Sequence, residues 1–123
     1  MVMLLVIEDS VPNAQLIQAA MESRGFEVVC VNNGDDGFRL AQELRPSVIL
    51  MDLRFPGKGR DGWQTIAAIK GEKNLNSIPI IVVSVEIQPD DRQRAYDAGC
   101  VAYFPKPFNI TELMNAVVKY AAP

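Results

Sequence analysis

The sequence predicts an α/β domain in which an open, doubly wound parallel sheet of five strands lies between two layers formed by five helices. Five short apolar runs, rich in Val and Ile, recur along the 123 residues, and amphipathic segments separate them. The runs are continuous rather than alternating, as in strands that are buried on both faces of a parallel sheet. Strict alternation of strand and helix implies right-handed crossovers, and we expect the strand order 2-1-3-4-5.

Apolar runs and helix signals place the elements along the chain. The predicted strands are Met3–Ile7, Val28–Val31, Val48–Met51, Ile80–Val83 and Val101–Phe104. Helices are expected from Ser10 to Arg24, from Asn33 to Leu44, around Trp63–Ile69, from Pro89 to Gly99 and from Ile110 to Ala121. The last has the clearest amphipathic pattern, with Asn109 or Thr111 as its cap. The tight turn at Lys106–Pro107 favours a cis peptide bond.

Composition and length exclude several classes of protein. The net charge is −3, with 49% apolar and 22% charged residues, which is typical of one globular domain over residues 1–123. No basic cluster points to nucleic acid, and the apolar run Met1–Ile7 is too short for a signal peptide or a membrane span. The chain has no histidine, which excludes catalytic triads that use histidine and zinc sites with histidine ligands. Cys30 and Cys100 are expected to be reduced, mostly buried thiols of a cytoplasmic protein.

Polar residues follow each predicted strand at the point where it ends, but Asn32 and Asn33 follow the second strand, which would lie off-centre in the sheet. Glu8 and Asp9 follow the first strand, Asp52 the third and Ser84 the fourth, and Lys106 comes shortly after the fifth. In open α/β sheets the functional site lies beyond the carboxyl ends of the strands, at the switch point of strand order. Each of these residues alone has an ordinary structural explanation, as a cap, a turn or a surface residue. Their convergence at one edge of the sheet predicts a site.

The charges at this edge indicate a divalent cation. Two like charges about 4 Å apart repel by about 4 kcal/mol at an effective dielectric constant of 20. Oxygen ligands without His or Cys favour Mg²⁺, and three carboxylates, Mg²⁺ and Lys106 together sum to zero charge. Such a balanced site suits transfer of a phosphoryl group to Asp52, because carboxylates act as nucleophiles that form aspartyl phosphates.

These residues resemble those of the response-regulator receiver domains, the CheY-like family of two-component signalling. The resemblance covers residues 2–121 and also includes Pro56, the pair Asp61–Gly62 and the segment Tyr103–Phe108. It implies a flavodoxin-like fold with Asp52 as the phosphorylation site. It further implies that Glu8, Asp9, Asp52 and the backbone carbonyl of Arg54 hold Mg²⁺, that Ser84 and Lys106 bind the phosphoryl group, and that Ser84 and Tyr103 form the switch.

Three features depart from the usual pattern of that family. The segment from Pro56 to Gly62 is longer than usual and carries Lys58 and Arg60, so that it is either a solvated insertion or a contact for a partner. Val85 stands where a small residue is common and narrows access to the phosphoryl group. Arg54 and Glu86 flank the site and could pair across it, although a surface ion pair contributes only about 0–1 kcal/mol.

The resulting functional prediction is a phosphorylation-controlled binding switch. A sensor histidine kinase or phosphotransfer protein donates a phosphoryl group from its phosphohistidine to Asp52. Ser84 is then drawn toward this group, Tyr103 turns into the space left, and the surface of the fourth helix, fifth strand and fifth helix changes. The target is another protein or an effector domain outside this chain. The chain catalyses only its own phosphotransfer and dephosphorylation, and so is not an enzyme acting on a metabolite.

Three alternatives remain beside this prediction. The first is a receiver-like interaction module that works without phosphorylation. The second is a Mg²⁺-dependent phosphatase with an aspartyl nucleophile, which Arg54 disfavours because such enzymes commonly carry a second Asp at that position. The third is a flavin carrier, which the acidic pair Glu8–Asp9 disfavours because it would repel a phosphate.

Overall fold

A computed structural model describes residues 2–53, 59–85 and 88–121. Five parallel strands form one sheet in the order β2-β1-β3-β4-β5, as predicted. The strands are β1 (Met3–Ile7), β2 (Glu27–Val31), β3 (Val48–Met51), β4 (Ile80–Ser84) and β5 (Ala102–Pro105). The helices are α1 (Val11–Glu22), α2 (Gly34–Leu44), α3 (Gly62–Lys70), α4 (Asp91–Asp97) and α5 (Ile110–Ala121). Each helix follows the strand of the same number.

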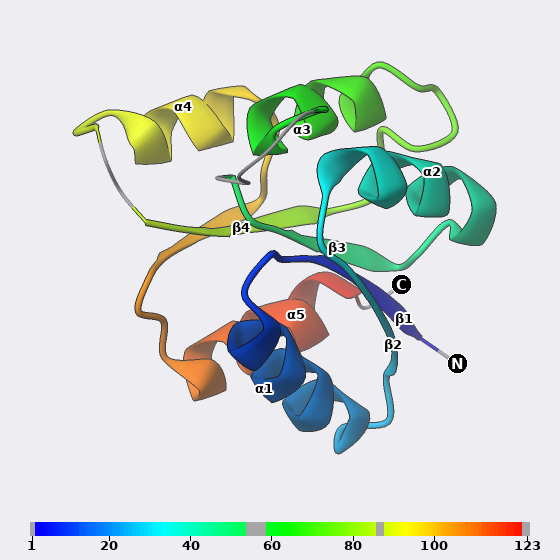
Figure 1. The fold of residues 1–123 in the computed structure, drawn as a ribbon, viewed down its shortest axis with the longest axis vertical. Helices are drawn as coiled ribbons and strands as arrows, with labels where there is room; N and C mark the ends of the chain where they lie inside the picture. The colour runs from blue at the N-terminus through cyan, green and yellow to red at the C-terminus, as the bar shows by residue number, and fades with distance from the viewer. Residues whose placement is uncertain (1, 54–58, 86–87, 122–123) are drawn as a thin grey trace.

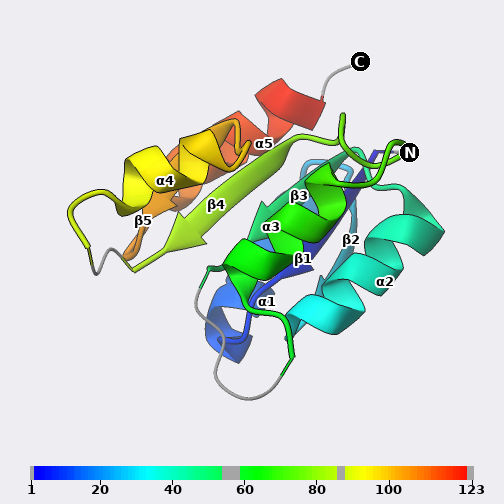
Figure 2. The same ribbon diagram turned by 90° about the horizontal axis from the view of Figure 1, so that it is seen from above.

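Two helical layers enclose the sheet. Figures 1 and 2 show α2, α3 and α4 over one face, and Figure 1 shows α1 and α5 on the other. Successive strand residues enter opposite cores: Leu5 and Ile7 pack in the first core, and Leu4 and Val6 in the second. All four are fully buried. Burial on both faces is the reason for the continuous apolar runs.

Most helices begin after a residue whose side chain caps the first turn, and the sequence predicts these capping residues. The Ser10 hydroxyl accepts from the Asn13 backbone N–H at 3.4 Å, and the Asn33 side chain accepts from the Asp36 N–H at 2.8 Å. At α5 the cap is Asn109 rather than Thr111, because its side chain accepts from the backbone N–H of Glu112 at 3.0 Å. These bonds satisfy N–H groups that have no partner within a helix.

The structure shifts several predicted boundaries. β4 extends through Ser84, which pairs in register with Pro105, so β5 also reaches one residue beyond its predicted end. α1 ends at Glu22 instead of Arg24, and α4 spans only Asp91–Asp97. Apolar runs mark the buried part of a strand, whereas pairing with the neighbouring strand sets its ends.

The two cysteines differ in burial, and one of them departs from the prediction. Cys100 is buried, and burial raises the pKa of its thiol to about 11. Cys30 is only half-buried, because it lies on the edge strand β2 and packs against the core from outside. The Lys106–Pro107 bond is cis, as predicted. None of the described helices is long and apolar enough to cross a membrane.

Candidate functional site

The topology gathers the predicted site residues at one end of the sheet. Glu8 and Asp9 follow β1, Asp52 follows β3, Ser84 ends β4 and Lys106 follows β5, and these four strands are consecutive neighbours. Backbone bonds extend the sheet into the site. The N–H groups of Glu8, Asp52 and Lys106 donate to the carbonyls of Val31, Ile7 and Ser84, respectively, each at 2.9 Å. The sheet itself therefore fixes where these side chains begin.

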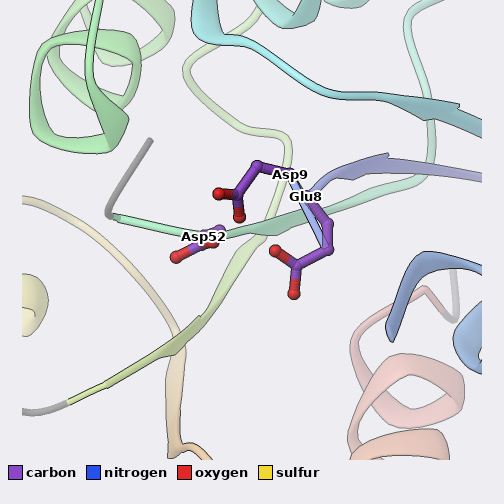
Figure 3. A group of neighbouring side chains, drawn as sticks. All are labelled: Glu8, Asp9 and Asp52. Atoms are coloured by element: carbon purple, nitrogen blue, oxygen red, sulfur yellow. The ribbon is translucent and has the colours of Figure 1, made fainter. Parts of the chain in front are cut away.

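Three carboxylates form the acidic centre of the site. One oxygen from each of Glu8, Asp9 and Asp52 lies within 4.8 Å of the others. Figure 3 shows the three side chains turned toward one another from the ends of β1 and β3. Glu8 is 4% and Asp52 3% exposed, while Asp9 is half-buried. Carboxylates this close and this buried repel strongly unless cations balance them.

Lys106 supplies one balancing charge from within the chain. Its Nζ atom lies 2.8 Å from Oε1 of Glu8 and 3.2 Å from Oδ2 of Asp52. Burial lowers the pKa of Lys106, but the hydrogen bond with Glu8 and the charges of Asp52 and Glu8 outweigh burial and raise it. Lys106 is therefore protonated at neutral pH. One ammonium against three carboxylates leaves a charge of about −2 when all three are ionised.

The donor set fits a magnesium ion. It consists of carboxylate oxygens only, which hard divalent cations prefer, and a charge of +2 would neutralise the remainder. Glu8 is already engaged by Lys106 and by the Asn13 amide, which donates at 3.4 Å. Asp9 and Asp52 are therefore the direct ligands that the geometry favours. Burial raises the pKa of Asp9, but hydrogen bonding with Asp52 and Glu8 and the charge of Lys106 lower it below its ordinary value.

Ser84 and Tyr103 lie on one face of the sheet. Ser84 is fully buried, and its hydroxyl donates to the Val85 carbonyl at 3.4 Å, a long and weak hydrogen bond. Tyr103 is 4% exposed in the core beneath α3 and α4. Tyr103 pairs in register with Val82, two residues before Ser84, so both side chains point to the same side. The guanidinium of Arg92 lies 5.1 Å from the centre of the Tyr103 ring.

Two residues that the sequence analysis did not assign to the site contribute to it. Asn13 on the first turn of α1 donates to Glu8, and a polar residue three positions after the cap Ser10 was the available signal. Gly62 lies against the backbone of Asp52, where a Cβ atom would collide with the Asp52 carbonyl oxygen. A glycine directly after the capping acid Asp61 was the signal for this close approach.

Some predicted residues fall outside the described part of the chain. These are Arg54, Pro56, Lys58 and Glu86, so the carbonyl ligand and the Arg54–Glu86 pair stay predictions. Val85 is 51% exposed and lines an open groove of about 420 Å³ together with Lys106. The other lining residues are Asn13, Leu16, Pro107 and Phe108.

Comparison with known proteins decides the family. The family model described as response regulator receiver domain matches residues 4–118, which is most of the chain. The chain belongs to the response-regulator receiver family. The resemblance noted in the sequence is thereby confirmed, and the fold it implies is the one observed. Receiver domains of two-component systems are signalling switches.

Relatives of this receiver domain include whole regulators and parts of longer proteins. It is 30% identical over 116 residues to the polar-differentiation response regulator DivK of Brucella anthropi, covering 94% of this chain and 93% of the relative. The receiver domain of sensor histidine kinase PA1611 from Pseudomonas aeruginosa has a magnesium ion coordinated in its active-site cleft. It is 31% identical, with a TM-score of 0.85 and coverage of 97% and 96%. The Francisella response regulator 1452 receiver domain is 26% identical, with a TM-score of 0.88 and coverage of 98% and 97%.

Proposed function

We propose that residues 1–123 form one receiver unit that accepts a phosphoryl group on Asp52 from a phosphohistidine of a sensor histidine kinase or phosphotransfer protein. The observation that carries this proposal is the convergence of Asp52 with Lys106 and two further carboxylates at the end of the sheet. A carboxylate oxygen of Asp52 attacks the phosphorus, the P–N bond breaks, and the leaving imidazole takes up a proton. Hydrolysis of the acyl phosphate later restores the carboxylate.

Each residue of the site has a separate part in this reaction. Asp9 and Asp52 hold Mg²⁺ together with the Arg54 carbonyl, and the metal supplies positive charge for the transferring oxygens. Lys106 pairs with one phosphoryl oxygen and Ser84 donates a hydrogen bond to another. Glu8 orients Lys106 through their 2.8 Å contact. The protein positions the reacting groups and neutralises the charge of the phosphoryl oxygens, and it turns over no diffusing metabolite.

The groove beside Lys106 supports a protein as the phosphoryl donor. Leu16 and Val85 are 48% and 51% exposed, and with Pro107 and Phe108 they form an apolar surface that shares Lys106 with the site. A donor protein whose histidine reaches Asp52 could bury this adjacent surface at the same time. Burying exposed apolar area on a partner is favourable by about 25 cal/mol per Å² before the costs of association.

The proposed response is a change in the surface of α4, β5 and α5. Phosphorylation replaces the single charge of Asp52 by about −2 and adds acceptor oxygens. Ser84 then exchanges its weak bond to the Val85 carbonyl for a charge-assisted bond, and Tyr103 on the same face turns toward the space that Ser84 leaves. The output is contact with a downstream protein or with an effector domain outside this chain.

Phosphorylation by a small donor tests the proposal. The protein is incubated with acetyl phosphate and Mg²⁺, and its intact mass is measured. Wild type is expected to gain one acid-labile phosphoryl group, and Asp52→Asn none. Asp36→Asn is the matched control, because Asp36 is an exposed acid on α2 that lines the neighbouring cavity with Glu8. Full uptake by Asp52→Asn would overturn the assignment of Asp52.

A further inference from the structure

The carboxylate of Glu8 is held on both of its oxygens by the start of α1. Asn13 Nδ2 donates to Oε1 of Glu8 at 3.4 Å, and the backbone N–H of Ser10 donates to Oε2, also at 3.4 Å. Both hydrogen bonds are long, so each is weaker than one of ordinary length. Glu8 is only 4% exposed, however, and a buried carboxylate depends on the donors that the protein supplies. Together the two bonds orient this carboxylate from the side of α1.

The oxygen of Glu8 that accepts from Asn13 also contacts Lys106. The Lys106 Nζ atom lies 2.8 Å from this Oε1 atom and 3.2 Å from Oδ2 of Asp52. Asn13, Glu8, Lys106 and Asp52 therefore form a continuous series of side-chain contacts, which we call the Asn13 network. At one end of this network is the proposed phosphoacceptor, and at the other end Asn13 lines the groove beside Lys106.

The backbone of α1 places Asn13 for this contact, and the side chain is not needed to form the helix. The backbone N–H of Asn13 donates to the hydroxyl of Ser10, which caps α1. The network instead uses the side-chain amide of Asn13. A substitution at position 13 can therefore remove the contact with Glu8 while the helix cap remains.

We infer that Asn13 is a positioning residue of the phosphoryl site, acting through Glu8 on Lys106; the inference rests on the proposed function. With both oxygens of Glu8 held, the ammonium of Lys106 has a fixed partner while its other contact is Asp52. Without the Asn13 amide, Glu8 can turn and Lys106 can move with it. More side-chain freedom is then lost when Lys106 is ordered against a phosphoryl group, so this group binds more weakly.

The place of Asn13 in the groove offers a different explanation, which can be separated from this one. If Asn13 only contacted a donor protein, its loss would slow transfer from that protein and leave the binding of small ligands unchanged. Charge alone also predicts no change, because the asparagine side chain is neutral. The Asn13 network predicts weaker binding of a small phosphoryl analogue. A well-formed hydrogen bond to a charged group corresponds to about a tenfold change in an equilibrium constant, and at 3.4 Å we expect about threefold.

The test compares Asn13→Leu with Gln15→Leu. Leucine keeps the branched shape of asparagine and favours a helix but has no donor. Gln15→Leu is the control, because it removes an exposed amide from the same helix. Binding of beryllofluoride at saturating Mg²⁺, and of Mg²⁺ alone, is measured by the fluorescence of Trp63, the only tryptophan. The NMR signals of the Lys106 side chain in the metal-free protein report on the network without any ligand.

Both substitutions are also made together with Glu8→Gln, which has no carboxylate to orient. A role through Glu8 predicts that Asn13→Leu has little further effect in this background. A general disturbance of α1 would instead weaken beryllofluoride binding equally in both backgrounds. Circular dichroism selects a temperature at which every variant is folded.

Asn13→Leu is expected to bind beryllofluoride about threefold more weakly than wild type, to keep nearly the same Mg²⁺ affinity and to shift the Lys106 signals. Gln15→Leu is expected to match wild type in all three. If wild type binds beryllofluoride and Asn13→Leu leaves either this affinity or the Lys106 signals unchanged, the inference is wrong and the proposed function stands. Equal weakening with and without Glu8→Gln would also overturn the inference. If wild type takes up neither beryllofluoride nor phosphoryl, the proposed function fails and the inference fails with it.

Discussion

Lys106 lies closer to Glu8 than to the proposed phosphoacceptor. Its Nζ atom is 2.8 Å from Oε1 of Glu8 and 3.2 Å from Oδ2 of Asp52, and both carboxylates are almost fully buried. The two acids therefore share one ammonium, with Glu8 as its nearer partner. Glu8 can retain Lys106 while the chemistry at Asp52 changes, and this arrangement leads to the first two predictions.

Replacing Lys106 by Met is expected to destabilise the metal-free protein by about 2–4 kcal/mol at pH 7, because the buried carboxylates of Glu8 and Asp52 lose the ammonium group that contacts both of them. Saturating Mg²⁺ should recover part of this loss by supplying charge to the same oxygens. Urea unfolding with and without Mg²⁺ measures both effects. Lys119→Met, which removes an exposed lysine of α5, should change the unfolding free energy by less than about 0.5 kcal/mol. Equal losses in the two variants would contradict the buried ion pair.

The same pair predicts a loss of stability at alkaline pH. The fold raises the pKa of Lys106, so its contribution is complete below the ordinary lysine value of 10.5 and disappears as the pH rises through the raised value. The unfolding free energy of wild type is therefore expected to fall more steeply above pH 10.5 than that of Lys106→Met. Urea titrations between about pH 9 and pH 12 compare the slopes. If the unfolding free energies of the two proteins fall equally steeply with pH, Lys106 has the same pKa in the folded and unfolded chains.

Asp9 is predicted to be a principal magnesium ligand. Asp9→Asn should weaken Mg²⁺ binding at least about tenfold, because magnesium is held by few protein carboxylates and each one matters. Asp36→Asn removes an equal charge from the exposed side of α2 and should change the affinity less than about twofold. Isothermal titration calorimetry gives both constants. Similar affinities for the two variants would place the metal elsewhere.

Ser84 is predicted to couple phosphorylation to Tyr103. A charge-assisted hydrogen bond contributes about 1.5–3 kcal/mol, and about 2.8 kcal/mol shifts a two-state equilibrium a hundredfold. Ser84→Ala is therefore expected to accept phosphate on Asp52 but to leave Tyr103 in its original orientation. Amide and aromatic NMR with a beryllofluoride mimic measures this, and Ser84→Thr, which retains the hydroxyl, should restore the response. Wild-type shifts of α4, β5 and Tyr103 in Ser84→Ala would exclude this coupling.

Val85 and Leu16 are predicted to affect the rate of phosphorylation by different donors. Val85 is adjacent to Ser84, so Val85→Ala should open the site and speed phosphorylation by acetyl phosphate about two- to fivefold. Leu16 lies on α1 at the other side of the groove, so Leu16→Ala should leave the acetyl phosphate rate unchanged. Leu16→Ala should instead slow phosphoryl transfer from a phosphohistidine protein by about tenfold, as expected when a side chain that is buried in the complex is truncated. The two rates are compared by intact mass. A slower acetyl phosphate reaction in Leu16→Ala would show that the groove shapes the site itself.

Local patterns in the sequence predicted the order of strands and helices and the polar residues that gather at one end of the sheet. A Val- and Ile-rich run reports burial on both faces, and the first polar residue after it marks the carboxyl end of a parallel strand. Glu8, Asp52 and Lys106 were therefore assigned to one edge without knowledge of any contact. The caps Ser10 and Asn33 were predictable for the same reason, since capping depends on neighbours within four residues.

Contacts between distant parts of the chain could not be read from such patterns. Cys30 was expected to be mostly buried, but the structure leaves it half-buried on the edge strand β2. Likewise, Arg60 was expected to lie in a solvated insertion or to contact a partner, whereas the structure pairs it with Asp35 on α2.

The sequence by itself determined which residues carry charge and which strand end each one follows. Only the tertiary structure decided that Lys106 lies nearest Glu8, that Asn13 reaches Glu8 and that Gly62 packs against Asp52. The physical reason is that periodicity and capping act over a few residues, whereas an ammonium among several carboxylates takes the partner that the strand register brings closest. That register is set by backbone pairing between strands far apart in the chain.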